Sequence, residues 1–343
     1  MRDVALRAGV STGTVSNVLN RAEIVSPEVV ARVRAAIDEL GYVRNDVARW
    51  LRAGDSTILG LIVPDVRSPF FAEIARGVQS SATERGLSML LGSSDGSVAL
   101  EQEHIATFAR QRVRGLLITP LGREHSALSR FATNGAPVVL VDAISDDDEF
   151  SCVYTDDAMA GRLAAEHLIA SGRSRLAFVG GPLAFHQIAE RLRGASQAVS
   201  RHSDVGLEIT LVEEPTLREG RRIGDALVSQ SRSRRPDAIM AANDLVAIGL
   251  MQALISAPRV RVPEDLAVIG FDDVELAQAS PVPLTSIRRH TDLVASTAAR
   301  LLVAEAADAN AATQRIVISP ELVIRRSTST ADPSDLTDSQ PLL

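Results

Sequence analysis

The segment at residues 3–20, DVALRAGVSTGTVSNVLN, predicts two short helices joined by a tight turn. Val4 and Ala8 lie four residues apart and share one face of the first helix, which Gly9 is suited to end. Ser11 is a suitable N-cap for the second helix. The order helix, turn, helix is typical of segments whose second helix enters the major groove of DNA, and an ordinary helical hairpin is the alternative.

The second predicted helix turns small polar side chains to solvent, because Val15, Val18 and Leu19 recur on its opposite face. Short polar groups near the start of such a helix reach base edges, while hydroxyl groups and backbone amides hold phosphates. The candidate DNA-binding residues in this part of the chain are Arg7, Ser11, Thr12, Gly13, Thr14, Ser16, Asn17, Asn20 and Tyr42.

A third helix is predicted to begin at Pro27 and to end at Gly41, which completes a helical head at residues 1–44. A short helical pattern follows within a hinge and linker at residues 45–57. It is too short to be stable alone, because isolated helices under about 12 residues are marginal in water. We expect it to be ordered against a second copy on DNA, with candidate contacts at Asn45, Ala48, Arg49, Leu51 and Arg52.

From residue 58 onward, short apolar runs alternate with helical stretches, beginning with the run at residues 58–63 and the helix at residues 69–85. Such alternation predicts parallel sheets covered by helices on both faces. About eleven such units are too many for one sheet, so we expect an α/β domain of two doubly wound lobes. The expected ranges are about 58–155 and 290–318 for the N-lobe, 156–288 and 319–327 for the C-lobe, and 328–343 for a disordered tail.

Polar residues directly after predicted strands are candidate ligand contacts, since doubly wound sheets bind ligands beyond the carboxyl ends of their strands. Asp142 and Asp272 each follow an apolar run. A carboxylate accepts hydrogen bonds from adjacent hydroxyl groups, which suits a hydroxyl-rich ligand. The alternative for each such residue is a helix N-cap, and we assign a cap or other structural role to Asp65 and Asp244.

A series of sequence motifs extends along nearly the whole chain. These motifs lie at residues 3–5, 8–12, 14–16, 25–28, 36–42, 45, 47–49, 51, 60–65, 69–73, 112–117, 180–182, 191, 242–244, 247–249, 268–273 and 284–287. In these motifs and their order the sequence resembles the LacI/GalR family of bacterial transcription regulators, and the resemblance is specific because so many motifs match in order.

The resemblance implies a two-lobed, periplasmic-binding-protein-like domain behind a helix-turn-helix head, with the short hinge helix in the minor groove and Leu51 wedged between base pairs. It implies a transcription regulator, most often a repressor that a small molecule releases from DNA, with co-repression as the alternative. By matching motif positions, the candidate effector contacts are Phe70, Phe71, Asp142, Arg191, Asn243 and Asp272, with Phe185 and Gln187 as specificity elements.

A sugar or related polyol is the expected effector, because Ala143 stands where a purine-binding relative would be expected to place an aromatic side chain. A nucleobase or another small metabolite is the alternative.

The chain has 36 basic residues, all arginine, 43 acidic residues and a net charge of −7. Residues 1–55 contain eight arginines against seven acidic residues, so the head is only weakly basic. Such a head should bind DNA poorly alone. We therefore expect a homodimer whose two heads read a pseudo-palindromic operator.

Other classes of protein fit the sequence less well. The chain shows no apolar run approaching about 18 residues and no export signal, so we expect a cytoplasmic protein without membrane contact rather than a periplasmic sugar-binding protein. An enzyme with a nucleotide-binding sheet should show G-x-G-x-x-G or a P-loop after its first strand, and neither follows residues 58–63. The histidines are scattered, and Cys152 is the single cysteine. We expect no catalytic residue, no cofactor and no metal site.

Overall fold

The computed structural model describes residues 1–42, 56–122, 125–145, 148–257, 260–308 and 310–329. The chain divides into two compact units between Ser56 and Thr57. The candidate hinge contacts Asn45, Ala48, Arg49, Leu51 and Arg52 lie outside the described residues.

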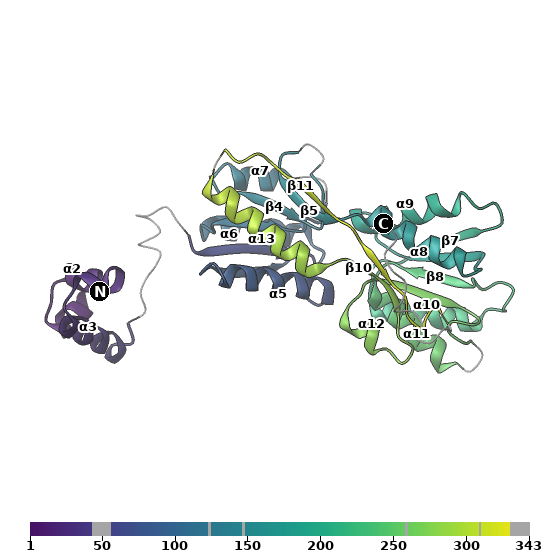
Figure 1. The fold of residues 1–343 in the computed structure, drawn as a ribbon, viewed down its shortest axis with the longest axis horizontal. Helices are drawn as coiled ribbons and strands as arrows, with labels where there is room; N and C mark the ends of the chain where they lie inside the picture. The colour runs from purple at the N-terminus through teal and green to yellow at the C-terminus, as the bar shows by residue number, and fades with distance from the viewer. Residues whose placement is uncertain (43–55, 123–124, 146–147, 258–259, 309, 330–343) are drawn as a thin grey trace. The chain divides into compact units, whose positions relative to one another are not determined.

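The first unit is a small helical head with its own hydrophobic core (Figure 1). Its elements are α1 (Arg2–Ala8), α2 (Thr12–Asn20), the short 3-10 helix η1 (Ala22–Ile24) and α3 (Pro27–Glu39). Val4, Val15 and Val33 bring one fully buried side chain from each α-helix to this core. The helix-turn-helix prediction is therefore confirmed.

The turn between the first two helices is built as the sequence predicts. Gly9 has a left-handed backbone conformation, with φ 64°, which glycine adopts without steric cost. Ser11 Oγ accepts a hydrogen bond of 3.0 Å from the Thr14 amide and so caps α2. Pro27 is the first residue of α3, and Ser26 precedes it without a side-chain cap hydrogen bond.

The N-lobe is built on a six-stranded parallel sheet in the order β11-β5-β4-β3-β1-β2. Helices α5 and α13 pack on one face, and α6 and α7 pack on the other (Figure 1). The bounds are β1 (Ile58–Val63), α5 (Pro69–Thr83), β2 (Ser88–Ser93), α6 (Val98–Arg110), β3 (Gly115–Ile118), α7 (Ser126–Ala132), β4 (Val138–Val141), β5 (Ser151–Thr155), α13 (Thr291–Ala307) and β11 (Arg315–Ile318).

The C-lobe has a second six-stranded sheet, in the order β12-β10-β9-β8-β6-β7, in which β12 alone runs antiparallel to its neighbour. Helices α8 and α9 pack on one face, and α10 and α11 pack on the other. The bounds are α8 (Asp157–Ala170), β6 (Arg175–Gly180), α9 (His186–Val199), β7 (Gly206–Leu211), α10 (Leu217–Ser229), β8 (Ala238–Ala241), α11 (Asp244–Ser256), β9 (Ala267–Asp272), α12 (Glu275–Ala279), β10 (Thr285–Arg288) and β12 (Glu321–Val323).

The burial of the strands explains these sheets. Strands β3, β4 and β8 are buried at every residue, which is typical of parallel strands covered on both faces. The edge strands β2 and β7 expose several side chains. The prediction of two doubly wound lobes is confirmed, and none of the described helices has the length and apolar character needed to span a bilayer.

Within the described residues, the chain passes between the lobes at three places: from β5 to α8, from β10 to α13 and from β11 to β12 (Figure 1). Asp157 lies just after the first of these connections, and Arg289 lies within the second. Both side chains are therefore held at the boundary between the lobes.

The C-lobe holds the chain through residue 328. Thr328 is 5% exposed, and its hydroxyl forms hydrogen bonds with Thr285 Oγ1 at 2.7 Å and with His167 Nε2 at 2.8 Å. The predicted start of the disordered tail at residue 328 is therefore wrong, because this side chain completes a buried polar network. Residues 330–343 lie outside the described residues.

Helices α8 and α9 approach each other closely at two glycines. A Cβ atom added at Gly161 would overlap the backbone oxygen of Arg191, and one added at Gly194 would overlap the backbone oxygen of Ala158. The close approach also fixes the backbone of Arg191 relative to α8.

We predict that Gly161→Ala lowers the free energy of unfolding of the lobes by about 1–3 kcal/mol, because the two helices must separate to admit the methyl group. Urea denaturation of the full chain measures the change. Gly206→Ala is the matched control, since a Cβ atom there meets nothing within 4 Å. Equal stability of the two variants would contradict this account of the helix contact.

Candidate ligand-binding site and nucleic-acid interface

A cavity of about 460 Å³ lies between the N-lobe and the C-lobe. Its lining comes from residues at or after the carboxyl ends of β1, β2 and β4 on one side and of β6, β7, β8, β9 and β10 on the other, including the first turns of helices α5, α9 and α11. These are the carboxyl ends of parallel strands, which is where doubly wound sheets bind ligands. All eight candidate effector residues line it: Phe70, Phe71, Asp142, Phe185, Gln187, Arg191, Asn243 and Asp272.

The floor of the cavity contains an ion pair that joins the lobes. Arg289, which follows β10 in the C-lobe, pairs through Nη2 with Oδ1 of Asp142, which follows β4 in the N-lobe. Arg289 Nη2 also lies 3.4 Å from Asp157 Oδ2, and Nη1 lies 3.4 Å from Asp272 Oδ1. Arg289 is 1% exposed, so these contacts are shielded from water.

Arg191 adds a second guanidinium group to this floor. Its Nε donates to Asp157 Oδ1 at 2.8 Å, its Nη1 donates to the Ala242 carbonyl, and its Nη2 lies 3.5 Å from Asp272 Oδ1. We call Asp142, Asp157, Arg191, Asp272 and Arg289 the buried charge cluster. It carries three carboxylates and two guanidinium groups, and hence an excess negative charge when every carboxyl group is ionised.

Burial changes the acidity of this cluster. It raises the pKa of Asp142 to about 6, because desolvation outweighs the attraction of Arg289. Burial also raises the pKa of Asp272. Within the cluster, Asp142 Oδ2, Arg191 Nη2 and Arg289 Nε are buried atoms without a hydrogen-bond partner among the described residues. The cluster therefore has unused acceptor and donor capacity beside the cavity.

The aromatic pair belongs mainly to the core. Phe70 and Phe71 pack edge to face with ring centroids 5.1 Å apart, and they are 3% and 9% exposed. The Arg289 guanidinium carbon lies 4.2 Å from the Phe70 centroid, so the ring faces a cation. Phe185 and Gln187 are half-buried at the start of α9 and expose more of their side chains to the cavity.

Asn243 and Asp244 have clear structural roles. Asn243 caps α11 by accepting a 2.9 Å hydrogen bond from the Val246 amide, and its Nδ2 donates to the Pro215 carbonyl. Asn243 also lines the cavity, so the same side chain caps α11 and faces the cavity. Asp244 accepts from the Val274 amide and from Ser286 Oγ, which confirms its predicted structural role.

Asp65 lies in the cavity lining and pairs with Arg67 through two short contacts, with Nε 3.0 Å from Oδ1 and Nη2 2.9 Å from Oδ2. The N-cap residue of α5 is Ser68, so Asp65 is not a helix cap. Three further acidic residues line the cavity and are exposed: Asp95, Glu213 and Glu214.

Sequence reasoning missed Asp157 and Arg289. Arg289 directly follows β10, so the rule that polar residues after strands contact ligands would have found it, had that four-residue strand been predicted. Asp157 is the first residue of α8, where an acidic residue is ordinary. Ala143 packs in the core beside α6 and α7 and does not line the cavity.

The head presents part of the predicted DNA-binding surface. Thr12 and Gly13 are exposed at the start of α2, and Asn17 is partly exposed one helical turn later. Asn20 Nδ2 donates to the Ser16 carbonyl at 2.7 Å, which orders the end of this helix. The surface offers short polar groups at helical spacing.

Two of the predicted DNA contacts have other partners. Arg7 forms a 2.7 Å ion pair with Glu39 on the exposed surface of the head, so a phosphate contact would have to compete with this carboxylate. Tyr42 packs against the core of the head.

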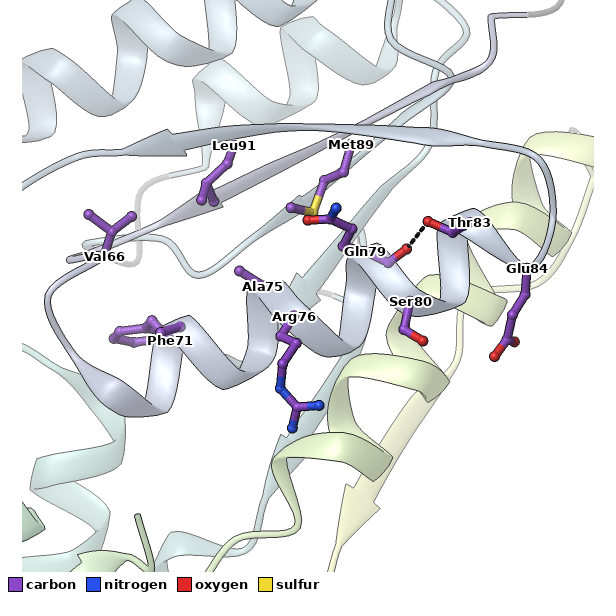
Figure 2. A pocket seen from close by; sticks show the side chains of 11 residues that line it. Val66, Phe71, Ala75, Arg76, Gln79, Ser80, Thr83, Glu84, Met89 and Leu91 are labelled. Carbon is purple, nitrogen blue, oxygen red and sulfur yellow. Dashed lines mark hydrogen bonds between the residues drawn. The ribbon is translucent and has the colours of Figure 1, made fainter. Parts of the chain in front are cut away.

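A second hollow, of about 710 Å³, lies along α5 and the edge strand β2 (Figure 2). Thr83 Oγ1 donates to the Gln79 carbonyl at its rim. Of the candidate site residues, Phe71 alone lines it. The apolar side chains of Val66 and Leu91 are 43% and 44% exposed there.

Comparison with known proteins supports both units. The family model of bacterial regulatory proteins of the lacI family matches residues 1–45, and that of the periplasmic binding protein-like domain matches residues 165–328. The ribose operon repressor of Escherichia coli (strain K12) is 34% identical over 332 residues, which cover 95% of this chain and 99% of the relative.

Two solved structures are similar over 95% of this chain and 98% of their own. The lac repressor dimer bound to operator and the anti-inducer ONPF is 26% identical with a TM-score of 0.81. The complex of the transcriptional regulator CelR with cellobiose is 30% identical with a TM-score of 0.71. The chain therefore belongs to the lacI family of bacterial regulatory proteins.

Proposed function

We propose that the protein is a transcriptional repressor that binds a pseudo-palindromic operator as a homodimer and leaves it when a sugar occupies the cavity between the lobes. The observation that carries the proposal is this cavity, whose floor joins a carboxylate of the N-lobe to guanidinium groups of the C-lobe. A ligand that contacts both sides changes the free energy of closing the cleft, which is the requirement for allosteric control. No catalytic residue is proposed.

The lining of the cavity supports a hydroxyl-rich effector. Asp272 and Gln187 offer oxygen acceptors, Gln187 offers amide donors, and Phe185 offers an apolar surface for one face of a ring. A similar protein is a ribose operon repressor, and another was solved with cellobiose. A nucleobase effector and a ligand that recruits the protein to DNA are the alternatives that the assays below distinguish.

The head supports the DNA-binding part of the proposal. Its second helix exposes Thr12 and Gly13, whose small size lets the helix backbone approach the duplex. The head is small and nearly neutral, so two heads acting together would supply the affinity. The hollow along α5 and β2, with its exposed Val66 and Leu91, is the surface that we assign to pairing of the two copies.

We predict that the full chain selects a two-fold symmetric sequence from random duplexes and sediments as a dimer. A thermal-shift screen with common sugars and nucleobases, followed by fluorescence anisotropy on the selected duplex, should identify a compound that stabilises the protein and weakens DNA binding at least tenfold. Co-repression would instead appear as tighter DNA binding. A monomer, or equal binding of random and selected duplexes at physiological salt, would overturn the proposal.

Asn17 is placed to read a base, and we predict that Asn17→Arg changes the selected operator at one position in each half-site. Asparagine pairs with adenine N6 and N7, while arginine pairs with guanine O6 and N7. The change is measured by repeating the duplex selection. Glu23→Gln removes one negative charge in the exposed part of η1 and so raises the net charge by the same amount; it should tighten binding without changing the preferred base. An unaltered motif in the Asn17 variant would contradict this role.

The buried charge cluster should respond to paired substitutions. We predict that Arg289→Gln destabilises the lobes by about 3 kcal/mol or more, because it leaves Asp142 and Asp157 without a shared cation in a buried site. Adding Asp157→Asn removes one of these carboxylates and should restore much of the loss. Urea denaturation of the two single variants and the double variant measures the coupling. Strictly additive losses would show that the cluster does not act as a unit.

A further inference from the structure

We infer that the effector carries no anionic group: the cleft takes a neutral or cationic ligand that donates hydrogen bonds, and it rejects sugar phosphates, sugar acids and nucleotides. The inference rests on the function proposed above and names the charge class of its effector.

The lining of the cavity is strongly acidic. Twice as many carboxylates as guanidinium groups face it from the described residues. The carboxylates are Asp65, Asp95, Asp142, Glu213, Glu214 and Asp272, and the guanidinium groups are Arg67, Arg191 and Arg289. Carboxylates come from both lobes, so an anion would meet like charge on either side of the cleft.

Each lining arginine already pairs with carboxylates. Arg67 binds both oxygens of Asp65 at 3.0 Å and 2.9 Å. Arg191 holds Asp157 at 2.8 Å and the Ala242 carbonyl. Arg289 pairs with three carboxylates of the buried charge cluster. A phosphate would have to take a guanidinium group away from one of these partners and leave that carboxylate buried or exposed without its counter-ion.

The helix N-termini at the cavity offset only part of the repulsion between an anion and the lining carboxylates. At α11 the Asn243 side chain accepts from the Val246 amide, and at α5 Pro69 removes one backbone donor. The N-termini of α5 and α9 favour an anion, since no side chain caps either helix. Each has an effective charge of about +0.5, and their sum is smaller than the excess of negative charge in the lining. These amides suit the oxygen of a hydroxyl or carbonyl group instead.

Carboxylate oxygens in the lining outnumber the arginine donors that lack a partner. Asp142 Oδ2, Arg191 Nη2 and Arg289 Nε are buried without a hydrogen-bond partner, and Asp95, Glu213 and Glu214 add exposed acceptors. A hydroxyl or ammonium group can donate to these oxygens, whereas an ionised phosphate or carboxylate offers acceptors alone. Matching donors to acceptors therefore selects polyols and amines.

The test compares matched ligands on the full-length protein by thermal shift and calorimetry at low salt. The probes are D-ribose with D-ribose 5-phosphate, D-glucose with D-gluconate and with D-glucosamine, and adenine with adenosine monophosphate. Wherever one compound of a matched pair binds the protein, we expect the neutral or cationic compound to bind at least tenfold more tightly than the anionic one. An anionic compound that binds more tightly and shifts DNA binding would overturn the inference while the proposed function stands. A panel in which nothing binds would overturn both.

Variants of exposed carboxylates in the cavity lining test whether charge causes the selection against anionic ligands. Glu213→Gln with Glu214→Gln removes two exposed carboxylates from the lining, and we expect it to narrow the affinity gap within a matched pair several-fold. Asp204→Asn with Glu208→Gln is the matched control, because it removes two exposed carboxylates of the same lobe outside the lining. Two results would contradict electrostatic selection by the lining. One is an unchanged affinity difference between neutral and anionic ligands in the Glu213/Glu214 variant, and the other is an equal decrease of this difference in the control variant.

Discussion

The contact between Arg289 and Asp142 is the interaction on which the effector domain depends, because it is the ion pair that ties one lobe to the other inside the cleft. Both groups are buried, so neither can exchange its partner for water at low cost. Asp157 and Asp272 hold the same guanidinium group from the C-lobe side. The position of Arg289 is thus fixed by carboxylates of both lobes.

The close contact of α8 and α9 positions two members of the buried charge cluster. Asp157 begins α8 and Arg191 lies on α9, so the glycines that let these helices touch also set the distance between the two charges. Packing and electrostatics are therefore coupled in this lobe. The head has its own core and caps, and its fold does not draw on the cluster.

The sequence predicted the architecture where its signals were strong. The apolar run at residues 58–63 matches β1, and Ser11 caps α2, because long buried strands and capping side chains have local signatures. Strands β10 and β12 were not predicted, since their sequences TSIR and ELV lack the apolar run that marks the four-residue strands β3, β4 and β8. Every candidate effector residue lines the cavity. Arg289 was missed because it directly follows β10, which the sequence did not reveal.

Cys152 is the single cysteine of the chain, and it lies within β5 with 1% of its surface exposed. Burial raises the pKa of this thiol, so the reactive thiolate form is scarce at neutral pH. In the folded protein, this thiol should therefore react only slowly with oxidants and alkylating reagents. One engineered surface cysteine could therefore be labelled selectively with a spectroscopic probe. Modification of Cys152 itself would report unfolding.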